Sequence, residues 1–188
     1  ILGPKDGKPI VTPGQDMVMG NFYLTMEETA EEFHDEAQRY LSVDCPKSAA
    51  MWQRYGDNEG HVFGSINEIL MAYETDQIHL HSRIAIPARA LNKTSFTDEQ
   101  QKQYLLTTVG KVIFNNMFPS DFPFLNEVSA ANFQATPEKY FLDMGKDVKE
   151  AIRNLPVTPA FKKKDLGKII GEIFKRYSTC LLYTSDAA

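Results

Sequence analysis

The most informative stretch of the chain covers residues 1–25 and reads ILGPKDGKPIVTPGQDMVMGNFYLT. Its first half is rich in Gly and Pro, and an Asp-Gly pair there is typical of a tight turn between two short extended pieces. A helix is expected next, because Thr12 is a suitable N-cap, Pro13 fits the first helical position and Gln15 can complete a capping box. We predict that this helix runs to about Met26.

The remaining sequence alternates short helical and extended patterns, which predicts an α+β fold of mixed helices and short strands. Residues 27–36 carry six carboxylates, a pattern typical of a solvated helical face, and residues 27–60 as a whole resemble a surface excursion. Helices are expected at 47–55, 66–75, 136–145, 146–154 and 165–178, and strands at 61–63, 78–86 and 104–114. Within the last of these strands, Gly110 predicts a bend or a close approach of two backbones.

Two histidines lie two positions apart in the predicted strand 78–86. Alternation along a strand points His79, His81 and Arg83 to one face, so the two imidazoles are placed to hold a metal ion together. A third ligand is not evident from the sequence. A basic stripe that faces solvent or another subunit is therefore the favoured interpretation, and we predict no metal site.

Composition restricts the class of protein without indicating its chemistry. The 188 residues carry a net charge of −5, which is not the electrostatic pattern of an autonomous nucleic-acid binder. No apolar run approaches the roughly 20 residues that cross a bilayer, so no membrane association is expected. The two cysteines, Cys45 and Cys180, are too few for a disulfide framework. These features predict a cytoplasmic globular protein.

The opening stretch resembles a known family. Residues 1–25 resemble the pattern I-L-x-P-x-x-G-x-P-x-x-x-P-x-Q-D-x-V-x-G-x-Y-x-x-T of the β′ (largest) subunit of bacterial DNA-directed RNA polymerase, with Phe22 at the position of its Tyr. The matching segment lies shortly after the three-aspartate loop that binds the catalytic magnesium in that family. Weaker similarity continues at 59–63, 79–86, 106–115 and 169–177.

Several positions depart from the family pattern. Gly14 stands where the family usually has Ser or Thr, Lys111 where Arg is common, and residues 27–58 exceed the usual length of this connection. The three-aspartate loop itself is absent from the sequence. The resemblance therefore implies a piece of an enzyme that is inactive by itself.

What the resemblance implies is a place in an assembly. Residues 1–20 would end the active-site domain, and residues 21–179 would form the pore domain, which borders the channel for entering nucleotides. The implied partners are the β, α and ω subunits and a sigma factor, with template DNA, RNA and nucleoside triphosphates reached through the assembly. The implied cofactor is Mg²⁺, held by residues outside this chain. Residues 180–188 resemble the translated read-through of a sequencing adapter.

Four residues of the opening stretch would lie near the active centre. Gln15 and Asp16 would sit in the first helical turn, where they could hydrogen-bond the backbone, a neighbouring subunit or the incoming nucleotide. Their alternative roles are structural, since Gln15 can serve as a capping partner and Asp16 suits the positive end of a helix. Lys5 and Lys8 could face phosphate, or could be ordinary surface lysines.

Two other interpretations stay open at this stage. A stand-alone interaction module would be stable by itself, whereas a polymerase segment should expose apolar faces that meet other subunits. A metal-dependent enzyme would use His79, His81 and the carboxylates of 27–36, and would carry zinc or manganese when purified.

Overall fold

The computed structural model describes residues 14–186, and it describes side chains as far as residue 177. The chain divides into two compact units. The central unit comprises residues Leu24–Ala160, and the terminal unit comprises Ile1–Tyr23 with Phe161–Ala188. Helices and a small antiparallel sheet make up the described residues, so the predicted α+β class is confirmed.

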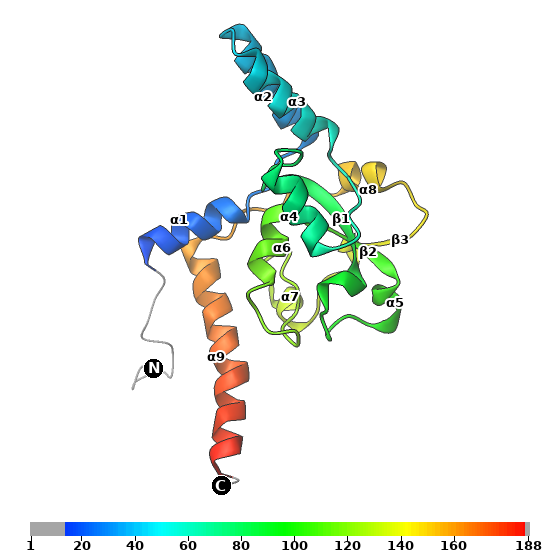
Figure 1. Cartoon of the computed structure of the whole chain (residues 1–188). Coiled ribbons are helices and arrows are strands. Elements are labelled where there is room, and N and C mark those ends of the chain that lie inside the picture. The colour runs from blue at the N-terminus through cyan, green and yellow to red at the C-terminus, as the bar shows by residue number, and fades with distance from the viewer. Residues whose placement is uncertain (1–13, 187–188) are drawn as a thin grey trace. The chain divides into compact units, whose positions relative to one another are not determined.

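Most elements belong to the central unit (Figure 1). In chain order they are α2 (Ala30–Ser42), α3 (Pro46–Asp57), α4 (Ile66–Glu74), β1 (Arg83–Pro87), η1 (Ala88–Leu91), α5 (Asp98–Gln101), β2 (Gln103–Thr108), α6 (Val109–Asn115), α7 (Ala130–Gln134), η2 (Glu138–Tyr140), β3 (Phe141–Asp143) and α8 (Val148–Asn154).

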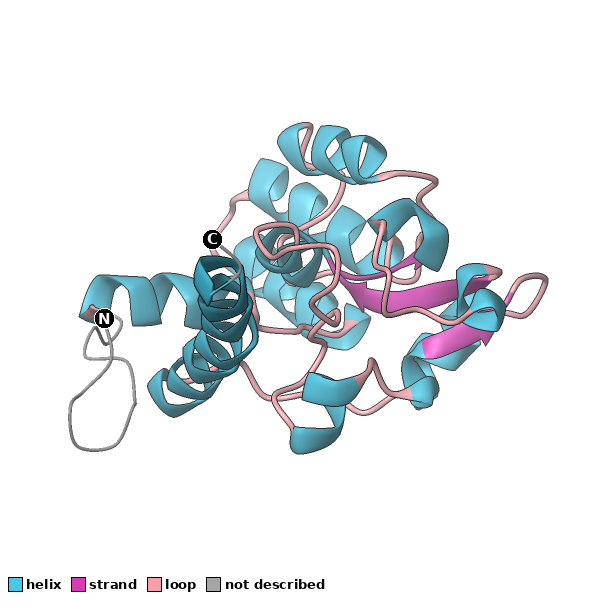
Figure 2. Cartoon of the chain, turned by 90° about the horizontal axis from the view of Figure 1, so that it is seen from below, coloured by secondary structure: helices cyan, strands magenta, loops and turns pink. Residues whose placement is uncertain are grey.

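The sheet of the central unit has the order β1-β2-β3, with both neighbouring pairs antiparallel. Ala85 of β1 lies opposite Leu106 of β2, and Leu105 lies opposite Phe141 of β3. Figure 2 shows the strands in magenta among the surrounding helices. Because side chains alternate along a strand, this register gives the sheet two distinct faces.

Both faces of the sheet are covered. One face packs against α4 and α6, where the buried side chains include Ile69, Ile84, Ile86, Leu105, Val109 and Val112. The opposite face meets α8 in a smaller cluster formed by Ala85, Leu106, Val148 and Ile152. A strand buried on both sides has no solvated face. The prediction that His79, His81 and Arg83 form an exposed stripe is therefore wrong for Arg83, which is buried.

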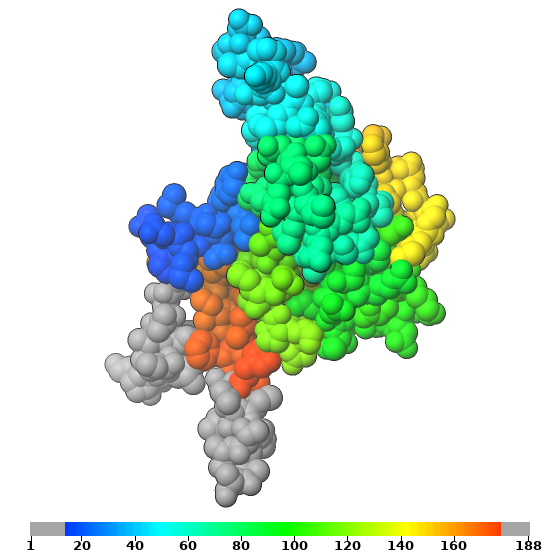
Figure 3. Space-filling view, viewed as in Figure 1, coloured from blue at the N-terminus to red at the C-terminus, as the bar shows by residue number. Residues whose placement is uncertain are grey.

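The acidic segment and the residues after it form a helical hairpin of α2 and α3. Thr29 starts α2 with a complete capping box, because its hydroxyl accepts the Glu32 amide and its own amide donates to the Glu32 carboxylate. At the base of the hairpin, Glu59 Oε2 accepts the Ala30 amide at 2.6 Å. Figures 1 and 3 show the hairpin, in blue to cyan, extending away from the sheet of the central unit.

Four predicted elements differ from the structure. Residues 61–63 do not form the predicted strand, since only Val62 pairs there, with Ala85 in an isolated parallel bridge. The predicted strand 104–114 ends at Thr108, and residues 109–114 belong to helix α6. The Thr108 hydroxyl accepts the Lys111 amide at 3.2 Å and so caps this helix. The predicted strand 78–86 begins only at Arg83, since residues 79–82 form a turn. The predicted helix 136–145 is the short η2 followed by β3, whose pairing with β2 outweighs the local helical signals.

The terminal unit contains α1 (Gln15–Leu24, whose last residue belongs to the central unit) and α9 (Lys163–Asp186). The proposed cap Thr12 and the turn before it lie outside the described residues. On α9, Leu166 and Ile169 are buried. The helix continues past the predicted end near 178, and residues 179–186 contain no Gly or Pro that would stop it.

Candidate functional site

The residues predicted to lie near an active centre fall in or before α1. Gln15 and Asp16 occupy the first turn of α1 and are exposed. Lys5 and Lys8 lie outside the described residues. The capping role proposed for Gln15 depends on Thr12, which also lies outside them. The structure therefore leaves these four assignments as predictions.

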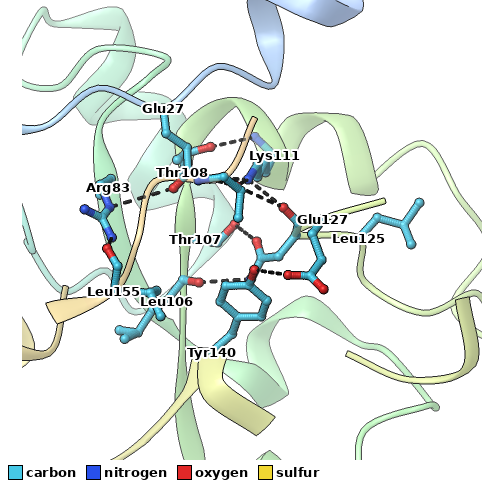
Figure 4. A network of polar contacts seen from close by, with 12 residues as sticks. Glu27, Arg83, Leu106, Thr107, Thr108, Lys111, Leu125, Glu127, Tyr140 and Leu155 are labelled. Carbon is cyan, nitrogen blue, oxygen red and sulfur yellow. Dashed lines mark hydrogen bonds and ion pairs between the residues drawn. The ribbon is translucent and has the colours of Figure 1, made fainter. Parts of the chain in front are cut away.

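The central unit holds a buried ion network that the sequence did not reveal (Figure 4). Its centre is Lys111 on α6, whose ammonium group lies 2.9 Å from Glu27 Oε2. The same group donates to the Asn126 carbonyl and to the Thr158 hydroxyl, each at 2.6 Å. All three N–H bonds of the ammonium group thus have acceptors. Burial lowers the pKa of Lys111, and the nearby Glu27 carboxylate opposes that shift.

Glu27 joins the network to the last segment of the central unit. Its Oε2 atom accepts the Thr158 amide at 2.9 Å and also accepts the Thr158 hydroxyl. Its Oε1 atom lies 3.7 Å from Arg83 Nε, and Arg83 in turn donates to the Leu155 carbonyl. Glu27 follows α1 closely and Thr158 precedes α9 closely. The network therefore fixes the first and last segments of the central unit to each other.

Asn126 connects this network to the sheet. Its side-chain amide donates to the Leu106 carbonyl at 3.0 Å, and its side-chain oxygen accepts the Thr107 hydroxyl at 2.6 Å. The Asn126 backbone amide donates to Asn132 Oδ1 at 3.1 Å. Figure 4 shows these groups around the end of β2, with Tyr140 and Glu127 beside them. Buried polar groups that are hydrogen-bonded hold one geometry firmly, so the network fixes the positions of the segments that it joins.

The sequence contained a partial signal of this network. The prediction of a solvated face for residues 27–36 is wrong for Glu27, whose side chain is only 8% exposed. Lys111, however, stands between Val109 and Phe114 in an otherwise apolar run, and a cation in such a run requires a buried partner. Which carboxylate supplies that partner could not be inferred, because Glu27 is 84 positions away.

A second polar cluster surrounds the two histidines. His81 is buried, and its Nδ1 atom lies 2.9 Å from Glu28 Oε2. His79 Nδ1 lies 3.8 Å from the same oxygen. The sequence showed no third ligand beside the histidines and offered the carboxylates of 27–36 only in an alternative interpretation, and the structure places one of them, Glu28, there. The prediction of an exposed stripe is thus wrong for His81 as well.

A buried lysine also lies in a small pocket on the other side of α6. Lys93 is 4% exposed and donates to the carbonyls of Pro119 at 3.1 Å and Asn115 at 3.4 Å. The pocket has a volume of about 150 Å³ and is also lined by Asn92 and Phe118. Burial lowers the pKa of Lys93 from 10.5 to about 8, with Asp121 opposing the shift.

This depressed pKa predicts a particular pH dependence of stability. Between about pH 8 and 10.5 the unfolded chain binds more protons at Lys93 than the folded chain, so the folded state gains stability as the pH rises through that window. We expect the free energy of unfolding of the wild-type chain to rise relative to that of Lys93→Met over this range. Urea denaturation of both proteins at several pH values measures the difference, and a difference independent of pH contradicts the assignment.

Comparison with known proteins identifies the family. A family model described as RNA polymerase Rpb1, domain 3, matches residues 1–183. The chain belongs to this family. The resemblance noted in residues 1–25 is thereby confirmed, and the match to Rpb1 domain 3 extends over both units of the structure.

Individual relatives of this Rpb1 domain 3 chain agree with the family assignment. The chain is 48% identical over 180 residues to the DNA-directed RNA polymerase subunit β′ of Streptococcus pneumoniae strains Hungary19A-6, CGSP14 and ATCC BAA-334/TIGR4. The aligned region covers 95% of this chain and 13% of each relative. The chain thus spans about an eighth of the length of these β′ subunits.

Two further features of the described residues concern membranes and metal ions. Among the described helices, none is both long enough and apolar enough to cross a membrane. Within the same part of the chain, the cluster of three potential metal ligands is Glu28, His79 and His81. Mg²⁺ prefers oxygen ligands in an octahedron, so a site with two imidazoles does not fit it.

Proposed function

We propose that this chain forms part of the β′ subunit of a bacterial DNA-directed RNA polymerase, a nucleotidyltransferase, and that it contributes wall to the pore beside the active centre. The observation that carries this proposal is the 48% identity to β′ subunits over 95% of the chain. The proposal assigns the chain a role in DNA-templated RNA synthesis without giving it catalytic groups of its own.

The character of the buried network supports a wall function. Phosphoryl transfer depends on positioning and on electrostatic stabilisation, which require a rigid surrounding structure. The ammonium group of Lys111 donates all three of its N–H bonds within the chain, and Glu27 Oε2 accepts from both Lys111 and Thr158. These groups are thus committed to holding the central unit together. The magnesium of the whole enzyme is proposed to bind residues outside this chain.

Exposed apolar side chains support assembly with other subunits. Met17 and Met19 on α1 are 59% and 63% exposed, and Met71 on α4 is 67% exposed. A polymerase segment is expected to expose such side chains where other subunits would cover them, whereas a self-contained interaction module has less reason to do so. We propose that the β, α and ω subunits and a sigma factor are the partners, that DNA, RNA and nucleoside triphosphates are reached through the assembly, and that the location is cytoplasmic.

The assignments in the opening stretch belong to the same proposal. Gln15 and Asp16 lie on an exposed helical turn, where either can contact a neighbouring subunit or a nucleotide. Lys5 and Lys8 are proposed to lie near phosphate. The proposed domain boundaries, at residues 20 and 179, follow from the same resemblance.

The test is a hybrid subunit. The gene for the Streptococcus pneumoniae β′ subunit is rebuilt so that this chain replaces the aligned segment, and the hybrid is assembled with the other subunits. We expect a complex that synthesises RNA from a promoter template, because the replaced segment retains the fold. A β′ subunit with the segment deleted serves as the negative control. A hybrid that assembles fully but makes no RNA contradicts the proposed role.

A further inference from the structure

We propose that Glu28, His79 and His81 form a binding site for Zn²⁺ or a similar first-row transition-metal ion. One ligand atom from each of the three side chains lies within 4.8 Å of the other two. The measured separations from Glu28 Oε2 are 2.9 Å to His81 Nδ1 and 3.8 Å to His79 Nδ1. This proposal does not rest on the proposed polymerase role, since it is argued from the geometry and chemistry of these three side chains.

The distances suit a tetrahedral ion. Zn²⁺ binds nitrogen and oxygen ligands at about 2.0–2.2 Å, which places two ligands of a tetrahedron roughly 3.4 Å apart. The two measured separations of 2.9 and 3.8 Å lie on either side of that value. Small side-chain rotations thus bring the three atoms onto one ion. Three protein ligands leave the fourth position open for water or for another ligand.

The chemistry of the three ligands selects among metals. Two imidazoles and one carboxylate are borderline ligands that favour Zn²⁺ and its first-row neighbours, whereas Mg²⁺ and Ca²⁺ prefer oxygen ligands alone. The same preference separates this site from the proposed magnesium centre of the whole enzyme.

The backbone holds the three ligands in place. The Glu28 amide donates to the His81 carbonyl at 3.1 Å, within an isolated parallel bridge between Glu28 and Ser82. The Ser82 hydroxyl accepts the His79 amide at 2.9 Å and closes the turn that carries both histidines. His79 Nδ1 also accepts the His81 amide at 3.0 Å, and a metal ion at that nitrogen replaces this hydrogen bond.

Aromatic rings surround His79 and limit its movement. The rings of Phe33, Trp52 and Tyr55, all from the helical hairpin, lie 5.5, 5.4 and 5.4 Å from the imidazole. An apolar shell of this kind restricts solvent and orients the metal ligands. The metal ion therefore links the base of the hairpin to the turn that precedes β1.

The closeness of Trp52 to His79 gives the experiment its signal. Trp52 is the single tryptophan of the chain, so tryptophan fluorescence has one source, and the surroundings of that source include His79. The purified full chain is stripped with a chelator and titrated with ZnCl₂, with MgCl₂ in a parallel titration. We expect one Zn²⁺ per chain, a saturable change in Trp52 emission, and no response to Mg²⁺. Co²⁺ is expected to give the visible absorption of a tetrahedral ion.

Variants separate this site from adventitious binding. Glu28→Gln keeps the shape of the side chain and its hydrogen bond to His81 but removes the anionic ligand. It is expected to weaken Zn²⁺ binding by more than the roughly 10–100-fold that loss of an outer-shell partner costs. The matched control is His61→Gln, because His61 is exposed and lies outside the cluster. This control is expected to leave the titration unchanged.

The proposal fails if Glu28→Gln binds Zn²⁺ as tightly as the wild-type chain, or if Trp52 emission does not respond to Zn²⁺. A measurement on the wild-type chain alone guards against misfolding of the variant. X-ray absorption of the Zn²⁺-loaded chain is expected to show two imidazole ligands. A spectrum with none or one overturns the assignment, even if Glu28→Gln does not fold.

Discussion

Replacement of Lys111 by methionine is expected to lower the free energy of unfolding by about 3–5 kcal/mol. It removes the ammonium group that lies 2.9 Å from the buried Glu27 carboxylate and leaves that carboxylate with the more distant Arg83, at 3.7 Å. Methionine retains most of the length of the lysine side chain, so the loss comes from charge and hydrogen bonding and not from a cavity. The Asn126 carbonyl also loses a donor that now lies 2.6 Å away. Urea denaturation followed by circular dichroism measures the change.

A double variant shows whether the buried pair is the cause. Glu27→Gln combined with Lys111→Met removes both charges of the 2.9 Å pair and is expected to recover part of the loss. The recovery is incomplete because the buried Arg83 loses its carboxylate neighbour. The exposed pair Arg39 and Glu36 provides the matched control, with side chains 62% and 31% exposed. Arg39→Met is expected to change stability far less than Lys111→Met, because solvent screens an exposed ion pair. Equal effects of Lys111→Met and Arg39→Met would contradict the importance of burial.

The second large effect is expected at Gly110, the second residue of α6. A Cβ atom there would lie 1.8 Å from the Leu24 carbonyl oxygen and 3.2 Å from that of Leu80. Both obstacles are backbone atoms, so a side-chain rotation cannot relieve the overlap. Gly110→Ala is therefore expected to destabilise the chain by at least about 3 kcal/mol, at the upper end of the usual cost of overpacking.

Gly20 is the matched control for this prediction. It lies within α1, and a Cβ atom added there meets nothing within 4 Å. Since Ala favours a helix over Gly by about 1 kcal/mol, Gly20→Ala should leave stability unchanged or raise it slightly. Thermal unfolding of the two variants gives the comparison. A Gly110→Ala protein as stable as the wild type would show that the backbones of α6 and Leu24 separate at little cost.

Elements with strong local signals were predictable from the sequence. The helix expected at 66–75 is α4, which begins after a Ser65 cap, and the helix expected at 47–55 is α3, which begins at Pro46. A cap residue or an initial proline acts on its own helix through contacts a few residues away. Such signals are therefore legible in a single sequence.

Elements that depend on distant partners were not predictable in the same way. Residues 109–114 have the β-branched composition of a strand, yet they form α6 because Thr108 caps them and the core receives their apolar side chains. The close approach expected at Gly110 is nevertheless present. β3 forms because it pairs with β2. The two segments lie almost 40 residues apart, so the local sequence does not predict this pairing.

The candidate sites show the same limit. The paired histidines were visible in the sequence, but Glu28 reaches them from 53 positions away. The buried role of Lys111 was not predicted; the apolar run around it is a signal of a buried cation, but it does not indicate Glu27 as the partner. In both sites, the sequence can draw attention to one partner, the histidines or Lys111. The other partner, Glu28 or Glu27, is known only once the three-dimensional structure is available.

The hydrogen bond between the Thr158 amide and the Glu27 carboxylate has a topological consequence. The chain therefore enters and leaves the central unit at neighbouring points, which this hydrogen bond joins. A change in the length of a loop within the central unit, or of the α2–α3 hairpin, leaves the distance between these two points unchanged. Related proteins can therefore differ in the length of these loops without a change in the segments that flank the central unit.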